Sequence, residues 1–354
     1  MAASVAVLGG VLKKYGKRHY PLHYIFFICL FCRNAYMLFI AGKSMERLVA
    51  ACCAFVITVA LALVVMRVME NLGKTGIDRH KASKPIVPEM GGLALFPGIC
   101  AGYAVLHIQE GYDSLLPVAL AMLIVWAIGI LDDAVALRQK VKLVLMFAAG
   151  LPLLFFGIGS IDLIVFSIDG GILYYVVVLV GIAASANLTN ILEGFNGEAV
   201  GLGVISLFFL SVDGLIVGNL ELSSLSIIVC FALAGLLVFN RYPARTFPGD
   251  TGTLLIGGAV GAISISQGVE ILGVMVLFPQ IAEFLMKSRV SFKGVSYGPT
   301  QVDEKGILHP PPYDSVANCI TRRIRLREPQ LVCVIWAIGA ACGLASAIVA
   351  YALF

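Results

Sequence analysis

Ten apolar runs separated by short polar segments are the feature that most restricts how this chain can fold. They cover roughly residues 46–69, 90–108, 115–131, 141–157, 172–189, 199–217, 224–240, 253–266, 269–287 and 330–353. A helix needs about 20 predominantly apolar residues to cross a bilayer core. Only 13% of the residues are charged, against about 25% in soluble domains. The chain is therefore predicted to be an all-α polytopic membrane protein with about ten transmembrane helices.

The basic residues fall into alternate connections between these runs. The 17 Lys and Arg residues between positions 70 and 330 lie in 70–89, 132–142, 240–251 and 287–329. The intervening loops 109–114, 158–171 and 218–223 contain none. With ten spans, all basic loops share one face, and the positive-inside rule makes that face cytoplasmic. We expect a multi-pass protein of the cell membrane whose functional loops are cytoplasmic.

The first 45 residues are predicted to be an extension of the membrane domain, which covers residues 46–354. A weaker apolar run, 22–41, carries Arg33 in its middle, so it is either an extra helix or lies upstream of a translation start at Met45. The long loop 287–329 is expected to form a small cytoplasmic cap. The nine cysteines show no zinc-binding spacing and are interpreted as small apolar residues.

Four polar clusters lie at the predicted cytoplasmic ends of these runs. They are Asp132, Asp133 and Lys142 in "DDAVALRQKVK", and the segments "NLTNILEGFNGEAVG", "FNRYPARTFPGDTGT" and "GIDRHKASKPIVPEMGG". Each has a structural alternative, such as helix capping by Asp250, but ionisable groups at membrane depth are costly and point to function. If the first cluster continues as helix, positions 132 and 142 lie about 15 Å apart.

The oxygen-bearing side chains in these clusters indicate a particular chemistry. Asp132, Asp133, Asp250 and Asn190 offer the hard oxygen ligands that Mg²⁺ prefers, usually completed by substrate phosphates and water. Lysines such as Lys142 neutralise phosphate as point charges. The sequence therefore predicts a Mg²⁺-dependent site for a phosphorylated substrate, with Mn²⁺ as an alternative metal.

The motifs "DDAVALRQKVK", "NLTNILEGFNGEAVG", "FPGDTGT" and "PEMGGLALF" resemble those of the polyprenyl-phosphate N-acetylhexosamine-1-phosphate transferases. The resemblance runs in order across about residues 46–354. It implies ten transmembrane helices, a cytoplasmic active site and transfer of a sugar-1-phosphate from a UDP-sugar to a polyprenyl or dolichyl phosphate, with UMP as the other product.

The same resemblance implies roles for individual residues. Asp250 is expected to be the principal Mg²⁺ ligand together with Asn190. Asp132 and Asp133 are expected near the acceptor phosphate, chiefly to orient it, with proton transfer by either acid left open. Lys142 is expected to contact the donor pyrophosphate.

The remaining expected contacts involve the donor nucleotide and sugar. The resemblance places Asn196 and Phe247 at the uracil, with Phe247 stacking, and places Glu89 near the site. Asn187, from the same polar cluster as Asn196, is a further candidate for substrate binding. The last loop lacks the Arg-His-Arg motif of eukaryotic members and the His-rich motif of bacterial ones, and resembles archaeal members instead. Arg289 and Lys293 are therefore the candidate bases for the donor, while the lone His309 is expected to be structural.

The expected donor is UDP-N-acetylglucosamine (UDP-GlcNAc), and the reaction would begin N-glycosylation or a surface glycan. Alternatives are a phospho-MurNAc-pentapeptide transferase and, in another class, an ion-coupled transporter. The expected partners are the UDP-sugar, the polyprenyl or dolichyl phosphate and the lipid bilayer, with no nucleic acid. The sequence leaves a homodimer open.

Overall fold

The computed structural model describes residues 44–81, 83–156, 160–163, 166–169, 171–289 and 300–353. The chain divides into two compact units, Met1–Leu48 and Val49–Phe354. Only the beginning of helix α3 in the first unit belongs to the described residues. The expected extra helix at 22–41 lies outside them, and the domain boundary at residue 45 stays a prediction.

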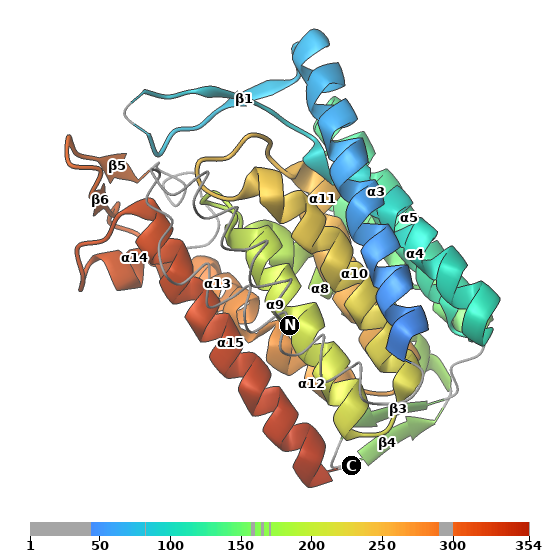
Figure 1. Ribbon diagram of the computed structural model, residues 1–354. Coiled ribbons are helices and arrows are strands. Elements are labelled where there is room, and N and C mark those ends of the chain that lie inside the picture. Colours follow the sequence, from blue (N-terminus) through green and yellow to red (C-terminus); the bar gives the residue numbers. More distant parts are fainter. Residues whose placement is uncertain are drawn as a thin grey trace, which may run out of the picture. The chain divides into compact units, whose positions relative to one another are not determined.

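Helices account for most of the second unit (Figure 1). The long helices are α3 (Ser44–Asn71), α4 (Leu95–Glu110), α5 (Leu115–Val135), α8 (Gly171–Ile191), α9 (Glu198–Ile216), α10 (Leu220–Asn240), α11 (Gly249–Ser266) and α15 (Glu328–Leu353). The shorter helices are η1 (Gly91–Ala94), α6 (Gln139–Ala148), α7 (Leu151–Phe155), α12 (Glu270–Val276), α13 (Phe278–Arg289) and α14 (Val316–Thr321). The predicted all-α class is confirmed.

Every predicted apolar run coincides with helix, but the runs are not all single spans. Seven helices in the described part of the chain are long and apolar enough to cross a membrane, or eight if the bent pair α12–α13, with its 67° angle, is one span. The run 141–157 is divided into α6 and α7, where Pro152 at the start of α7 lacks a backbone N–H. The number of ten crossings stays a prediction.

Three small antiparallel hairpins lie at the two ends of the helices (Figure 1). The strands are β1 (Thr75–Ile77) with β2 (Ile86–Pro88), β3 (Ser160–Leu163) with β4 (Phe166–Asp169), and β5 (Gln301–Val302) with β6 (Leu308–His309). The hairpins β1–β2 and β5–β6 lie with α14 at one end, and β3–β4 lies at the other. The described parts of the basic loops 70–89 and 287–329 thus share an end, as their charge predicts.

Close helix packing aligns the three helices that carry most of the polar clusters, α5, α8 and α11. A Cβ added to Gly129 of α5 would lie 2.5 Å from the Cα of Thr251 in α11. A Cβ at Gly257 of α11 would overlap the carbonyl oxygen of Ser185 in α8. Small residues allow helix backbones to approach this closely. The ends of α5, α8 and α11 are therefore held in a fixed relation.

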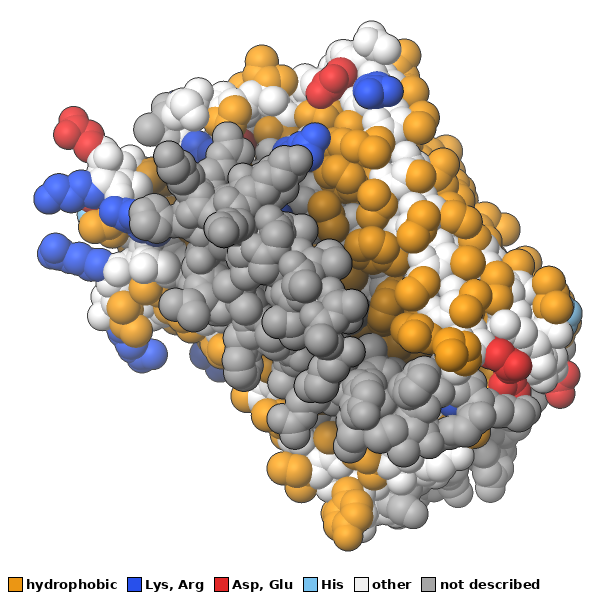
Figure 2. Space-filling model, in the orientation of Figure 1, with side chains coloured by type: hydrophobic (Ala, Val, Ile, Leu, Met, Phe, Trp, Pro, Cys, Tyr) orange, Lys and Arg blue, Asp and Glu red, His pale blue; other side chains and the backbone are white. Residues whose placement is uncertain are grey.

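The surface of the helices is apolar where no other helix covers it. Val56, Leu63 and Val64 of α3 are exposed, and Figure 2 shows hydrophobic side chains along this flank. Lys and Arg side chains gather at the end that carries β5, β6 and α14. An apolar flank below a basic end is the pattern expected for helices in a bilayer. The described cysteines, Cys52, Cys53, Cys100, Cys230, Cys319, Cys333 and Cys342, are free.

Candidate active site

A cluster of four side chains joins the ends of α5, α6, α8 and α11. The Nζ of Lys142 lies 2.6 Å from Oδ2 of Asp132 and 2.6 Å from Oδ2 of Asp250. Asn190 donates its Nδ2 to Oδ1 of Asp250 at 2.7 Å and to Oγ1 of Thr253 at 2.9 Å. The Lys142 side chain is only 4% exposed, whereas that of Asp250 is 31% exposed. The cluster thus presents Asp250 to a ligand, with one lysine behind it.

The turn between α5 and α6 brings Lys142 back to Asp132. Helix α5 stops at Ala136, which adopts a left-handed conformation with φ of 51°, and Oδ1 of Asp132 accepts from the N–H of Leu137 at 2.8 Å. Helix α6 then begins after Arg138, whose backbone is extended. The separation of about 15 Å expected for a continuous helix is therefore wrong, because the chain reverses between the two residues.

Asp133 does not join this cluster but accepts hydrogen bonds from the first turn of α11. Its Oδ1 accepts from the backbone N–H of Asp250 at 2.8 Å, and its Oδ2 accepts from the N–H and the hydroxyl of Thr251 at 2.9 and 2.6 Å. A Cβ at Gly249 would lie 2.6 Å from Oδ2 of Asp133, so only glycine leaves room for this contact. A carboxylate at a helix N-terminus satisfies unpaired N–H groups and complements the helix dipole. The two adjacent acids thus have different partners.

Asp250 and Asn190 are the residues here that suit a divalent cation. Among the residues that the structure describes, no group of three or more His, Cys, Asp or Glu side chains is arranged to hold a metal ion. Mg²⁺ does not require such a group, because it is often bound by one or two carboxylates and completed by substrate phosphates and water. Asn190 uses its Nδ2 toward Asp250, so its amide oxygen is left for a ligand. The donor set fits a cation that arrives with a phosphorylated substrate.

A cavity of about 220 Å³ lies next to this cluster. Its walls are formed by Glu193, Gly194, Phe195, Asn196, Ala199, Asn240, Phe247 and Pro248. Two of these, Asn196 and Phe247, are the residues expected to contact uracil, and they come from segments 51 positions apart in the sequence. The structure therefore brings both to one cavity beside the metal candidates.

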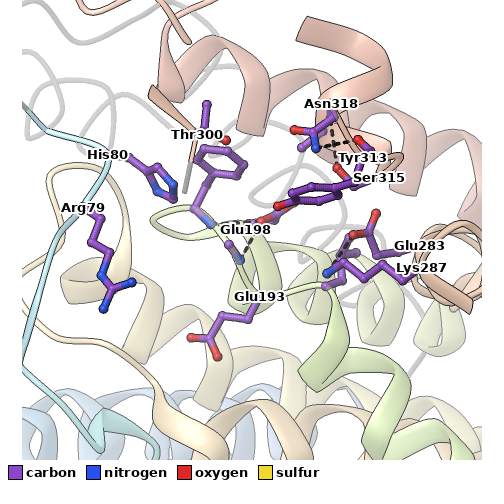
Figure 3. Close-up of a pocket in the computed structure, with 14 residues that line it drawn as sticks. Arg79, His80, Glu193, Glu198, Glu283, Lys287, Thr300, Tyr313, Ser315 and Asn318 are labelled. Atoms are coloured by element: carbon purple, nitrogen blue, oxygen red, sulfur yellow. Dashed lines mark hydrogen bonds and ion pairs between the residues drawn. The ribbon is translucent and has the colours of Figure 1, made fainter. Parts of the chain in front are cut away.

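A second cavity, of about 270 Å³, also borders the loop that follows α8 (Figure 3). Its lining residues are Arg79, His80, Leu192, Glu193, Gly194, Phe195, Glu198, Glu283, Lys287, Thr300, Tyr313, Ser315, Ala317 and Asn318. Residues 193–195 line both cavities. Most of the other lining side chains are polar, and Tyr313 and His80 add ring surfaces. A wall rich in hydrogen-bonding groups suits a polar ligand.

Buried charges hold the walls of the larger cavity in place. Glu283 of α13 accepts from the N–H of Val316 at 2.6 Å and forms an ion pair of 2.9 Å with Lys287. Lys287 also donates to the carbonyl of Ile191 at 2.7 Å. Glu198 accepts from the N–H groups of residues 194 and 195, both at 3.0 Å. These contacts fix the loop after α8 relative to α13 and α14.

Negative charge accumulates where the cavities and the cluster meet. Glu193 is accessible from both cavities that it lines. Desolvation by the surrounding protein, together with the carboxylates of Asp250, Asp133 and Glu89, raises the pKa of Glu193 to about 8, and Lys142 opposes this shift. Several carboxylates face one lysine, so a bound cation would relieve their repulsion.

The other predicted site residues have varied surroundings. Glu89 lies beside Gly76, where an added Cβ would overlap its carboxylate. Asn187 donates to the carbonyl of Ala183, one turn earlier in α8, at 2.7 Å, and Arg289 is exposed at the end of α13. Lys293 lies outside the described residues. His309 is 56% exposed and lies 3.3 Å from Asp303, and the roles of these residues stay predictions.

The structure also shows residues whose importance the sequence did not reveal. Glu328, the first residue of α15, accepts from the backbone N–H of Asn196 at 2.9 Å. Asp78, in the β1–β2 hairpin, accepts from the Asn196 side chain at 2.8 Å. An acid at a helix start is an ordinary capping signal, so nothing marks Glu328 in the sequence. Asp78 belongs to one of the polar clusters, but its partner is 118 residues away.

Comparison with known proteins identifies the family. Residues 115–268 match glycosyl transferase family 4. A protein of Sulfolobus acidocaldarius, whose assigned name is UDP-N-acetylglucosamine–dolichyl-phosphate N-acetylglucosaminephosphotransferase, is 33% identical over 82% of this chain and 92% of its own length.

Bacterial relatives match a smaller part of the chain. A Bacillus subtilis protein named undecaprenyl-phosphate N-acetylglucosaminyl 1-phosphate transferase is 30% identical over 62% of this chain and 64% of its own length. A phospho-N-acetylmuramoyl-pentapeptide-transferase of Clostridium beijerinckii is 30% identical over 58% of this chain and 68% of its own length. The long apolar helices and this kinship agree: the chain is an integral membrane enzyme that belongs to glycosyl transferase family 4.

Proposed function

We propose that this enzyme transfers GlcNAc-1-phosphate from UDP-GlcNAc to dolichyl phosphate, releasing UMP. The observation that carries the proposal is that residues from three separated motifs meet at one site in a chain that matches the archaeal relative over 92% of that relative's length. UDP-MurNAc-pentapeptide is the alternative donor, because relatives that use this type of substrate by name match the chain at 30% identity. We prefer GlcNAc because the archaeal match covers far more of both chains. Family membership leaves no support for a transporter.

In the proposed reaction an oxygen of the acceptor phosphate attacks the β-phosphorus of the donor. The bond between that phosphorus and the bridging oxygen breaks, so the sugar phosphate joins the lipid as a diphosphate and UMP leaves with the bridging oxygen. The lipid phosphate is ionised near neutral pH, since its second pKa is about 6. It therefore needs little help from a general base, and Asp132 is free to hold Lys142 in position.

Catalysis of this kind depends on positioning and charge neutralisation. Lys142 is held between two carboxylates at 2.6 Å each, so its ammonium group cannot turn away when phosphates approach. Asp133 contributes by fixing the first turn of α11, which carries Asp250. Each acid of the pair would thus act through the residue it holds, rather than through direct contact with the phosphate.

Asp250 and Asn190 would hold Mg²⁺, or Mn²⁺, together with the donor diphosphate. When bound, the ion supplies neutralisation of the charge that develops on the phosphate oxygens. Asp250 is the accessible member of the cluster, and Asn190 contacts it directly. Removal of divalent ions with EDTA is expected to abolish transfer and to weaken the binding of UMP to wild type. It should not weaken the binding of UMP to an Asp250→Asn variant, which already lacks the metal-binding carboxylate.

The two cavities would accommodate the rest of the donor. Asn196 and Phe247 in the 220 Å³ cavity would hold uracil, with the ring of Phe247 stacking on the base. The 270 Å³ cavity, which shares residues 193–195 with the first, would hold the sugar. Arg79 in that wall is a candidate base for the donor in addition to Arg289 and Lys293. The polyprenyl chain would remain in the lipid.

The proposed location is the cell membrane, with the site on its cytoplasmic face. The support is the shared position of the basic loops, because positively charged loops stay on the cytoplasmic side. In this setting the reaction would begin the assembly of an N-linked or surface glycan on its lipid carrier.

Purified membranes containing the enzyme should be incubated with tritiated UDP-GlcNAc, Mg²⁺ and dolichyl phosphate. We expect label in the organic extract together with an equal amount of UMP. A parallel reaction with UDP-MurNAc-pentapeptide should give no lipid product. If lipid product formed only with the second donor, the sugar assignment would be wrong. If neither donor gave any, the transferase proposal would fail.

A further inference from the structure

Asn196 is anchored by two acids that come from distant parts of the chain. Glu328 accepts from its backbone N–H at 2.9 Å, and Oδ2 of Asp78 accepts from its side-chain Nδ2 at 2.8 Å. The exposed fractions are 6% for Asn196 and 3% for each acid. Both the backbone and the side chain of Asn196 therefore have a fixed direction.

Lys81 keeps Asp78 in this position. Its ammonium group forms an ion pair with Oδ2 of Asp78, the same oxygen that Asn196 uses. It also lies 3.8 Å from Oε2 of Glu328 and 4.6 Å from the centre of the Tyr242 ring. An ionised carboxylate only accepts hydrogen bonds, so Asn196 must turn its NH₂ group, and not its oxygen, toward Asp78.

This contact decides which half of the Asn196 amide a ligand meets. An asparagine side chain has one donor end and one acceptor end, and the donor end is committed to Asp78. Among the described residues, no donor contacts the amide oxygen, and Asn196 lines the 220 Å³ cavity. The oxygen is therefore the group that is left for a ligand in this cavity.

We infer that Asp78 is a positioning residue that makes the enzyme select uracil over cytosine. The inference rests on the proposed function, in which the nucleobase occupies the cavity. Uracil carries a donor, N3–H, on its pairing edge, whereas cytosine has an acceptor at N3. An amide oxygen held toward the base accepts a hydrogen bond from the N3–H of uracil, but it repels the N3 lone pair of cytosine. Asp78 never touches the base and acts through Asn196.

The test compares the binding of UMP and CMP to purified enzyme in the presence of Mg²⁺ by isothermal titration calorimetry. Wild type should bind UMP at least about tenfold more tightly than CMP, because a mismatched base leaves a buried polar group unpaired. In Asp78→Ala the amide is free to turn, so the preference should fall to about threefold or less. Asp78→Asn keeps an oxygen beside Lys81 and should keep the wild-type preference.

Glu328→Gln is the matched control. The glutamine side chain can still accept from the backbone N–H of Asn196, and a backbone N–H is always a donor. The affinities for UMP and CMP can therefore both weaken in this variant, while the ratio between them stays at the wild-type value. The inference is overturned if Asp78→Ala keeps the wild-type ratio of UMP to CMP affinity. It is also overturned if Glu328→Gln loses this preference to the same extent as Asp78→Ala. Equal binding of UMP and CMP by wild type also overturns it, even if Asp78→Ala does not fold.

The outcome also separates this inference from the proposed function. If wild type transfers GlcNAc-1-phosphate but binds UMP and CMP equally, the role of Asp78 is refuted and the transferase stands. If wild type neither binds UMP nor transfers the sugar phosphate, both are refuted.

Discussion

Replacing Asp133 with alanine should destabilise the protein as well as reduce its activity. Asp133 receives three hydrogen bonds from the first turn of α11, two from backbone N–H groups and one from the Thr251 hydroxyl. Alanine leaves all three donors without this acceptor. The same turn carries Asp250, so its loosening should also disturb the contacts of Asp250 with Lys142 and Asn190.

The size of the effect can be worked out from these contacts. A hydrogen bond to a charged group contributes about 1.5–3 kcal/mol, so three would give about 4.5–9 kcal/mol if nothing replaced them. Asp133 is only half-buried, so water can enter and satisfy part of the loss. Removing a helix N-cap costs about 0.5–2 kcal/mol. We therefore expect about 2–4 kcal/mol for Asp133→Ala, and about 1 kcal/mol for Thr251→Val, which removes only the hydroxyl contact.

The loss of stability can be measured by thermal unfolding in detergent, monitored by tryptophan fluorescence. The rate of sugar-phosphate transfer is measured on the same variants. The unfolding midpoint should be highest for wild type, lower for Thr251→Val and lowest for Asp133→Ala. Both variants should bind UMP more weakly than wild type. An Asp133→Ala protein as stable as wild type but inactive would refute the anchoring role. Asp133 would then act on the acceptor phosphate directly.

Three further predictions concern the other site residues. Lys142→Met should lower kcat by about 10²–10³-fold, as expected for loss of a group that stabilises developing charge, and a loss below tenfold in the tritium assay would contradict its role. Phe247→Ala should raise the KM for UDP-GlcNAc by about tenfold through loss of stacking, with little change in the KM for dolichyl phosphate, whereas equal changes would argue against stacking. Because the pKa of Glu193 is raised to about 8, its carboxyl binds a proton more tightly in the folded state. The contribution of Glu193 to the stability of the metal-free protein should therefore be most favourable below about pH 4.3, the ordinary pKa of glutamate, and should decline as the pH rises toward 8. Glu193→Gln should show a smaller decline in the unfolding midpoint across this range, and an identical decline would show that other groups cause it.

The helices and the meeting of the polar clusters could be predicted from sequence for simple physical reasons. Long apolar runs mark helices in membranes because backbone polar groups must be satisfied within the segment. The distribution of the bases placed the loops on one face. These two signals place the polar clusters at one end of the helices, and there the structure brings Asp132, Lys142, Asn190 and Asp250 together.

The local geometry of the acidic pair could not be predicted in this way. Alanine favours helix, so Ala136 with its φ of 51° carries no signal for the reversal that returns Lys142 to Asp132. Adjacent acids in a helix point in different directions, but only the neighbouring helix determines that Asp133 meets α11. The contact of Glu328 with Asn196 joins residues 132 positions apart, and no local pattern encodes it.

The fate of the donor's β-phosphorus tests the proposed chemistry most directly. UDP-GlcNAc labelled with ³²P at that atom should be incubated with the purified enzyme, dolichyl phosphate and Mg²⁺. Transfer of a sugar phosphate predicts that the label moves quantitatively into the lipid product and that the nucleotide product is unlabelled UMP. Labelled UDP beside an unlabelled glycolipid would contradict it, because the sugar would then have moved without its phosphate.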